Sequence, residues 1–105
     1  MPGPIPAKVV DSLGMAAGPE LDARKRAVAC AREILDGRCP TDEGARRMTD
    51  ELLPALHGEP AARRFADSFA ETLRELRARP SNRHRVDDRI RHLAWQVVAA
   101  WRQPN

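Results

Sequence analysis

Proline and glycine interrupt this sequence at regular intervals, and these breaks constrain its fold more than any other feature. Proline has no amide hydrogen for a helix interior, and glycine readily adopts the positive φ that closes a helix. Helices therefore tend to begin at a proline and to end at a glycine. The breaks lie at Gly18-Pro19, at Gly37 to Pro40, at Gly58 to Pro60 and at Pro80. They predict four helices, over residues 19–36, 41–57, 60–79 and 83–102.

Two residues of the second predicted helix carry local expectations of their own. Thr41 precedes Asp42 and Glu43, so we expect Thr41 to be the N-cap, with both carboxylates beside the positive end of the helix dipole. Pro54 lies inside the same segment, on the face opposite the apolar side chains. Water can replace the lost hydrogen bond on that face, so we expect a kink at Pro54 and not a break.

The apolar residues of each segment fall on one face at about 100° per residue, which is typical of amphipathic helices. No stretch alternates with period two, as a strand would. The expected core positions are Leu21, Ala27, Val28, Ala31, Ile34 and Leu35, then Ala45, Met48, Leu52 and Leu56, then Ala62, Phe65, Ala66, Phe69, Leu73 and Leu76, and finally Val86, Ile90, Leu93, Ala94, Val97 and Trp101.

Short connections between these segments make consecutive helices antiparallel neighbours. We therefore predict an all-α protein, an up-down-up-down four-helix bundle with a short N-terminal arm. The bundle is one domain, residues 19–105, because 105 residues leave little room for a second. The arm comprises residues 1–18 and is expected to be partly disordered or to form one short helix.

Several classes of protein are excluded by composition. No apolar run approaches the roughly 20 residues that cross a bilayer, and the N-terminus lacks the basic start and apolar stretch of a secretory signal. We therefore expect a cytoplasmic protein with no membrane partner, in which Cys30 and Cys39 are free thiols. These cysteines and the histidines do not show metal-ligand spacing, so no metal and no cofactor are predicted. No phosphate-binding glycine loop is present, and no small-molecule site is predicted.

Paired carboxylates offer one route to enzymatic chemistry. Glu71 and Glu75 lie one turn apart, but arginines lie within reach of both. General acid–base catalysis needs a carboxyl group that is desolvated or coupled to another, and nothing in the pattern buries these. The sequence therefore favours a protein that is not an enzyme.

A basic cluster occupies residues 74–91. Seven arginines stand there against three acidic residues, which leaves +4, whereas the whole chain carries +3. Arginine binds phosphate through a planar fork of donors, so the cluster predicts an alternative function, nucleic-acid (RNA) binding. The residues expected to contact nucleic acid are Arg77, Arg79, Arg83, Arg85 and Arg89.

The same cluster contains the stretch Arg79-Pro80-Ser81-Asn82-Arg83-His84. This R-x4-H spacing resembles the catalytic signature of the HEPN ribonucleases, a family of small dimeric helical bundles. The resemblance implies that Arg79 and His84 act on the scissile phosphate of RNA. Pro80 departs from the family pattern, which prefers a polar residue directly after the arginine. A histidine that titrates near neutral pH, beside an arginine, suits such acid–base chemistry.

Trp95 is the residue on which the main functional prediction depends. Its side chain is expected about 160° from the centre of the apolar face of its helix, beside Val98 and between Arg91 and Arg102. An indole ring left in water exposes a large apolar area, so a covering partner is expected. These four residues predict a partner-binding surface, with Trp95 as its anchor.

Two different partners fit this surface. The N-terminal arm could fold back over the indole ring, using the apolar side chains of Val9, Val10 and Leu13. The other partner is a second protein or a second copy of the chain, with the arginines pairing acidic groups at the rim. The second option predicts a small non-enzymatic protein–protein interaction module that can form a homodimer.

Overall fold

The computed structural model describes residues 21–56 and 58–102, which are helical apart from short connections. One helix covers residues 21–35. Helix α2 spans Thr41–Arg47 and continues as a π-helical turn, Met48–Leu52, and a 3-10 turn, Pro54–Leu56. Helix α3 spans Pro60–Ala78, a 3-10 turn covers Pro80–Asn82, and α4 spans Arg83–Trp101. The predicted arm, residues 1–18, lies outside the described residues.

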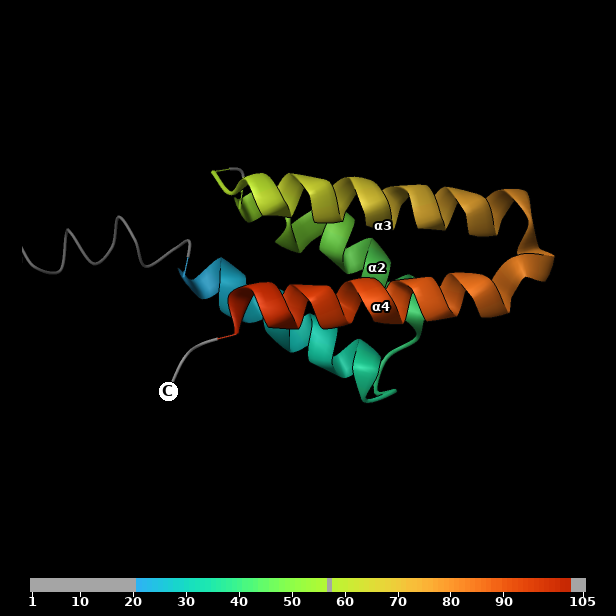
Figure 1. The fold of residues 1–105 in the computed structure, drawn as a ribbon, viewed down its shortest axis with the longest axis horizontal. Coiled ribbons are helices and arrows are strands. Elements are labelled where there is room, and N and C mark those ends of the chain that lie inside the picture. The colour runs from blue at the N-terminus through green and yellow to red at the C-terminus, as the bar shows by residue number, and fades with distance from the viewer. Residues whose placement is uncertain (1–20, 57, 103–105) are drawn as a thin grey trace, which may run out of the picture.

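The four helical segments form a bundle in which consecutive members run in opposite directions (Figure 1). The helix of residues 21–35 and α3 run one way, whereas α2 and α4 run the other way, and α3 packs along α4. The predicted all-α, up-down-up-down bundle is therefore confirmed. None of the helices in the described ranges is both long enough and apolar enough to span a membrane.

The predicted breaks at Gly37 to Pro40, at Gly58 to Pro60 and at Pro80 coincide with observed helix ends, whereas the break at Gly18-Pro19 lies outside the described residues. Gly37 has a φ of 75°, and the amide of Arg38 donates to the carbonyl of Glu33 at 2.9 Å. The amide of Gly37 donates to the carbonyl of Ile34 at 3.2 Å, which completes a Schellman motif. Pro60 occupies the first turn of α3, where its missing amide hydrogen costs nothing.

The expected role of Thr41 as N-cap is wrong. Pro40 occupies the N-cap position and Thr41 is the first residue of α2. The Thr41 side chain is buried, and its hydroxyl donates to the Asp87 carboxylate on α4. The hydroxyl therefore joins two helices that are distant in sequence and does not cap its own helix.

The chain around Pro54 changes helix type and does not simply kink. The amide of Leu53 donates to the carbonyl of Met48 at 2.9 Å, five residues back, and a 3-10 turn begins at Pro54. A π turn and a 3-10 turn are the local adjustments that relieve a proline within a helical segment. Pro54 is exposed, as its position on the outer face predicts.

Most of the expected core positions are buried, including all of those predicted in α4. Leu21 and Leu35 are the exceptions, because 40% and 37% of their surfaces are exposed. Phe65, Ala66 and Leu76 are partly buried against the core. Six described residues outside the expected positions are also buried: Ala23, Cys30, Thr41, Gly44, Leu53 and Thr72.

At Gly44, α2 lies in close contact with the helix of residues 21–35. A Cβ atom at Gly44 would lie 2.6 Å from Cδ1 of Ile34, and closer still to its Cγ1. The same atom would lie 3.1 Å from Sγ of Cys39, and the Cys30 thiol donates to the Gly44 carbonyl at 3.7 Å. Only glycine fits this crossing without moving a neighbour.

Candidate functional site

The two tryptophans of α4 have opposite environments. Trp101 is 8% exposed and packs edge-on against Phe65, with ring centroids 5.4 Å apart and an interplanar angle of 81°. Trp95 is 59% exposed, the highest value among the large hydrophobic residues that the structure describes. The expectation that the Trp95 ring lies outside the core is therefore confirmed.

Trp95 continues a row of α4 residues that faces the helix of residues 21–35. Arg83, Asp87 and Arg91 follow one another at four-residue intervals, and all three border a hollow that Ile34 also lines. Residues four apart share one side of an α-helix, so Trp95 is the next member of this row. Each interval of four residues also rotates the side-chain direction by about 40° around the helix axis. Trp95 therefore points further from the core than Asp87 and Arg91 do.

The helix of residues 21–35 contributes a second apolar row. Leu21, Val28 and Leu35 are spaced by seven residues and therefore lie on one side of this helix. Glu33, on the other side, forms an ion pair with Arg47 of α2 at 3.8 Å. The apolar row therefore lies on the side of this helix that is turned away from the Glu33–Arg47 pair.

Leu21, Leu35 and Trp95 are the exposed large hydrophobic side chains of the described residues. Trp95 and Val98 lie on one side of α4, because they are three residues apart, and Arg91 and Arg102 lie on the same side at intervals of four residues. We call the surface that these four residues form the Trp95 seam. Val98 is partly buried and packs against the core. Arg91 and Arg102 are exposed beside it, and Arg91 lies 3.6 Å from the Asp88 carboxylate. The seam therefore has an apolar centre and a charged rim.

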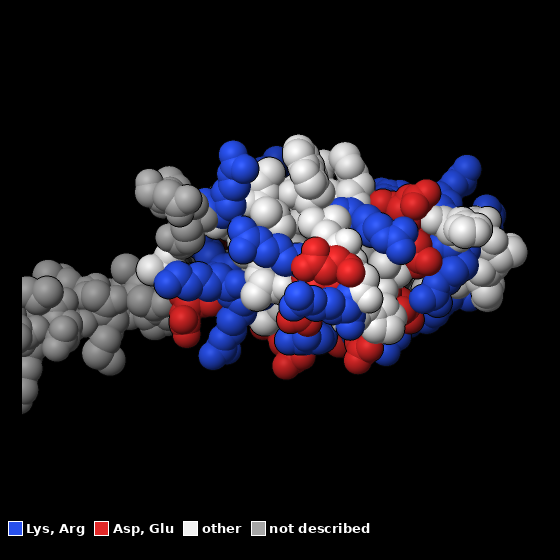
Figure 2. Space-filling view, turned by 90° about the horizontal axis from the view of Figure 1, so that it is seen from below, with Lys and Arg blue, Asp and Glu red and all other residues white. Residues whose placement is uncertain are grey.

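The predicted basic cluster is partly neutralised. Arg83 forms ion pairs with Asp42, at 3.1 Å, and with Asp87, at 3.3 Å. Five arginines of the cluster are exposed and have no carboxylate within 4.0 Å in the described part of the chain: Arg74, Arg77, Arg79, Arg85 and Arg89. Figure 2 shows that basic and acidic side chains are interspersed over one face of the molecule, with uncharged surface between them.

The two residues of the R-x4-H stretch lie on either side of the α3–α4 corner. Arg79 follows the last residue of α3, His84 is the second residue of α4, and the turn Pro80–Asn82 separates them. Both side chains are exposed. Within residues 21–56 and 58–102, no hydrogen bond or ion pair joins them, and their role in RNA cleavage stays a prediction.

The cysteines are free thiols in an environment that disfavours the thiolate. Burial raises the pKa of Cys30 to about 11, an effect that the nearby Arg47 partly opposes. Burial also raises the pKa of Cys39, and the neighbouring Glu33 and Glu43 add to this effect. Both thiols are therefore protonated near neutral pH, the form that is a poor nucleophile. The described residues contain no group of three or more His, Cys, Asp or Glu placed to hold a metal ion.

Comparisons with protein-family models, with curated proteins and with solved structures find no match to this chain. Among the predicted partner-binding residues, Trp95, Val98, Arg91 and Arg102 lie at one surface. Leu21 and Leu35 are also exposed, and the sequence pattern placed them wrongly in the core.

Proposed function

We propose that this chain is a non-enzymatic protein–protein interaction module that pairs with a second copy of itself through the Trp95 seam. The observation that carries the proposal is the exposed Trp95 ring, with Val98 beside it on the same side of α4. Exposed apolar patches with polar rims are characteristic of interaction surfaces. The seam contains one tryptophan and two arginines, and both residue types are enriched among the residues that dominate binding energy.

The area available at Trp95 is large enough to matter for association. A tryptophan side chain of about 250 Å² that is 59% exposed has about 150 Å² left to bury. At about 25 cal/mol per Å², covering it contributes at most about 4 kcal/mol per copy. The translational and rotational freedom lost on association offsets most of this contribution. A stable dimer therefore also requires burial of the apolar surface beside Trp95.

The charges at the rim suit a twofold arrangement. A symmetric dimer uses the same patch on both copies, so the patch must complement itself. Arg91 and Arg102 supply positive charge, whereas Asp87 and Asp88 of the same helix supply negative charge. Arginines of one copy can therefore face carboxylates of the other, around two buried Trp95 rings.

Sedimentation of the full chain tests this proposal. We expect a concentration-dependent dimer that Trp95→Ala converts to a monomer, while circular dichroism shows unchanged helix content. Arg89→Ala is the matched control, because Arg89 is an exposed residue of α4 outside the seam, and this variant should still dimerise. A chain that stays monomeric at several hundred micromolar contradicts pairing with a second copy. Reduced exposure of Trp95 to a quencher, reversed by Val9→Asp, would then identify the N-terminal segment as the cover.

A second candidate function is binding of RNA by the basic cluster. It is supported by four of the five proposed contact residues, which form no ion pair with any other residue that the structure describes. These are Arg77, Arg79, Arg85 and Arg89. Affinity for labelled RNA should then fall steeply with salt, whereas an apolar dimer interface should respond little. RNA cleavage that His84→Ala abolishes would support the nuclease version. Cleavage that survives this substitution would refute it.

A further inference from the structure

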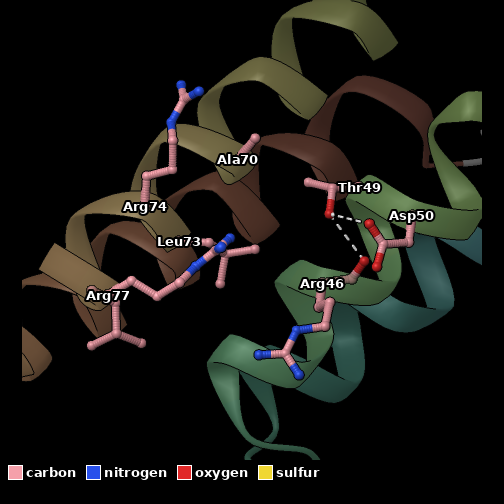
Figure 3. Close-up of a pocket in the computed structure, with 8 residues that line it drawn as sticks. Arg46, Thr49, Asp50, Ala70, Leu73, Arg74 and Arg77 are labelled. Atoms are coloured by element: carbon pink, nitrogen blue, oxygen red, sulfur yellow. Dashed lines mark hydrogen bonds between the residues drawn. The ribbon is translucent and has the colours of Figure 1, made fainter.

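A groove lies between α3 and the segment that joins α2 to its π-helical turn (Figure 3). Its volume is about 600 Å³. Arg46 and Asp50 stand on the α2 side, and Leu73, Arg74, Leu76 and Arg77 stand on the α3 side. None of these residues belongs to the Trp95 seam, so the groove is a separate surface.

The floor of the groove is apolar and follows α3. Ala70, Leu73 and Leu76 are spaced by three residues, so the floor extends about 9 Å along the helix. Leu73 is 8% exposed, whereas Ala70 and Leu76 are half-buried. This length matches one to two turns of a helix laid against α3, which would bury its own apolar side chains there.

The rim of the groove is positively charged. Arg46, Arg74 and Arg77 stand against a single carboxylate, that of Asp50. No carboxylate of the described residues lies within 4.0 Å of these three guanidinium groups, although five other arginines form such pairs. In Figure 3 the Arg77 side chain extends into the space between the two walls, and Arg74 extends from α3 in another direction.

Hydrogen bonds within the α2 wall hold its polar groups in place. The Thr49 hydroxyl donates to the carbonyl of Arg46 at 3.0 Å and also lies 3.4 Å from the Asp50 carboxylate. The Asp50 carboxylate therefore already has a neighbour on its own helix. The three arginines are the groups left to meet charges on an occupant.

We propose that this groove binds a short amphipathic helix of a partner protein, with leucine-like side chains on its apolar face and carboxylates beside them. The apolar side chains would cover Leu73 and Leu76, and the carboxylates would accept hydrogen bonds from Arg46, Arg74 and Arg77. A nucleic-acid backbone would use the arginines but would leave the aliphatic floor uncovered. The described residues that line the groove include no aromatic side chain on which bases could stack.

Fluorescence anisotropy of labelled peptides with the full chain tests the proposal. The first probe is a 16-residue peptide with leucines at positions i, i+3, i+4 and i+7 and glutamates on both sides of that stripe. The second probe has the same composition in scrambled order, and the third is an oligouridylate RNA of equal charge. We expect saturable binding of the first probe and at least tenfold weaker binding of the other two.

Variants locate the binding surface. Arg74→Gln with Arg77→Gln should weaken binding of the first peptide at least tenfold, whereas Arg85→Gln with Arg89→Gln should change it less than twofold. All four arginines are exposed, so the folded chain is expected to tolerate both changes. Trp95→Ala should also leave peptide binding unchanged, which separates this groove from the Trp95 seam.

Three results would overturn the proposal. Equal binding of the ordered and the scrambled peptide would show that charge alone is recognised. Preferential binding of the RNA, lost in the Arg74→Gln/Arg77→Gln variant, would assign the groove to nucleic acid. Equal loss of peptide binding in both double variants would show a diffuse electrostatic effect and no groove.

Discussion

Gly44→Ala is expected to destabilise the bundle, although the same change stabilises most exposed helix positions. At an open site, alanine gains about 1 kcal/mol over glycine in a helix interior. Here the new Cβ atom would lie 2.6 Å from Cδ1 of Ile34, whereas carbon atoms in good contact lie about 3.5–4.0 Å apart. Ile34 is 1% exposed, so its side chain can move away from the new Cβ atom only by repacking against its neighbours.

The clash must be relieved by moving either a side chain or a helix. An isoleucine forced off its rotamer costs about 1 kcal/mol, and overpacking in a core costs about 1–3 kcal/mol. After the gain in helix propensity, we expect a net loss of about 1–2 kcal/mol of unfolding free energy. For a chain of this size, this loss lowers the melting temperature by roughly 4–12 °C.

Urea denaturation followed by circular dichroism measures this difference. A double-mutant cycle with Ile34→Ala isolates its cause, because that substitution removes both clashing carbon atoms. In the Ile34→Ala background, Gly44→Ala should become neutral or stabilising. If Gly44→Ala alone raises the unfolding free energy above that of the unsubstituted chain, the two helices are not in close contact at Gly44.

Two further predictions concern side chains buried between helices. Thr41→Val removes the hydroxyl that donates to Asp87 and should cost about 1.5 kcal/mol in the same denaturation assay, whereas Thr49→Val, at a more exposed hydroxyl, should change stability by less than about 0.5 kcal/mol. Cys30 should react with a thiol reagent only as fast as the chain opens, because it is buried and its pKa is raised to about 11 from an ordinary value of 9.0. The unfolded thiol ionises first as pH rises, so stability should fall between pH 9 and pH 11, and Cys30→Ala should reduce this fall. Rapid labelling of Cys30 at neutral pH would contradict its burial.

The bundle could be predicted from the sequence because its signals are local. Pro60 and Gly37 fix helix ends through their own backbone chemistry, and the apolar positions of α4 keep a regular period. The exposure of Trp95 followed from the same period, because that residue lies far from the centre of its apolar face.

The features that the sequence did not reveal depend on distant partners or on irregular turns. Thr41 bonds to a residue 46 positions away, which no capping pattern encodes. Leu52 and Leu53 are both buried. The π turn Met48–Leu52 interrupts the spacing of 100° per residue that holds in α2, so the residues after it do not continue the pattern of α2. Leu21 and Leu35 lie at the edge of their apolar face, where the packing of the other helices decides how much of each side chain is covered.

The π-helical turn Met48–Leu52 is a place where the chain can lose one residue and keep the same bundle. A turn closed by a five-residue step holds one residue more than an α-helical turn between the same neighbours. A homologue with a single deletion in this stretch could therefore rejoin the flanking helical turns in regular α geometry and keep the same bundle. A one-residue gap here in an alignment would mark a local change of helix type and leave the packing of the other three helices intact.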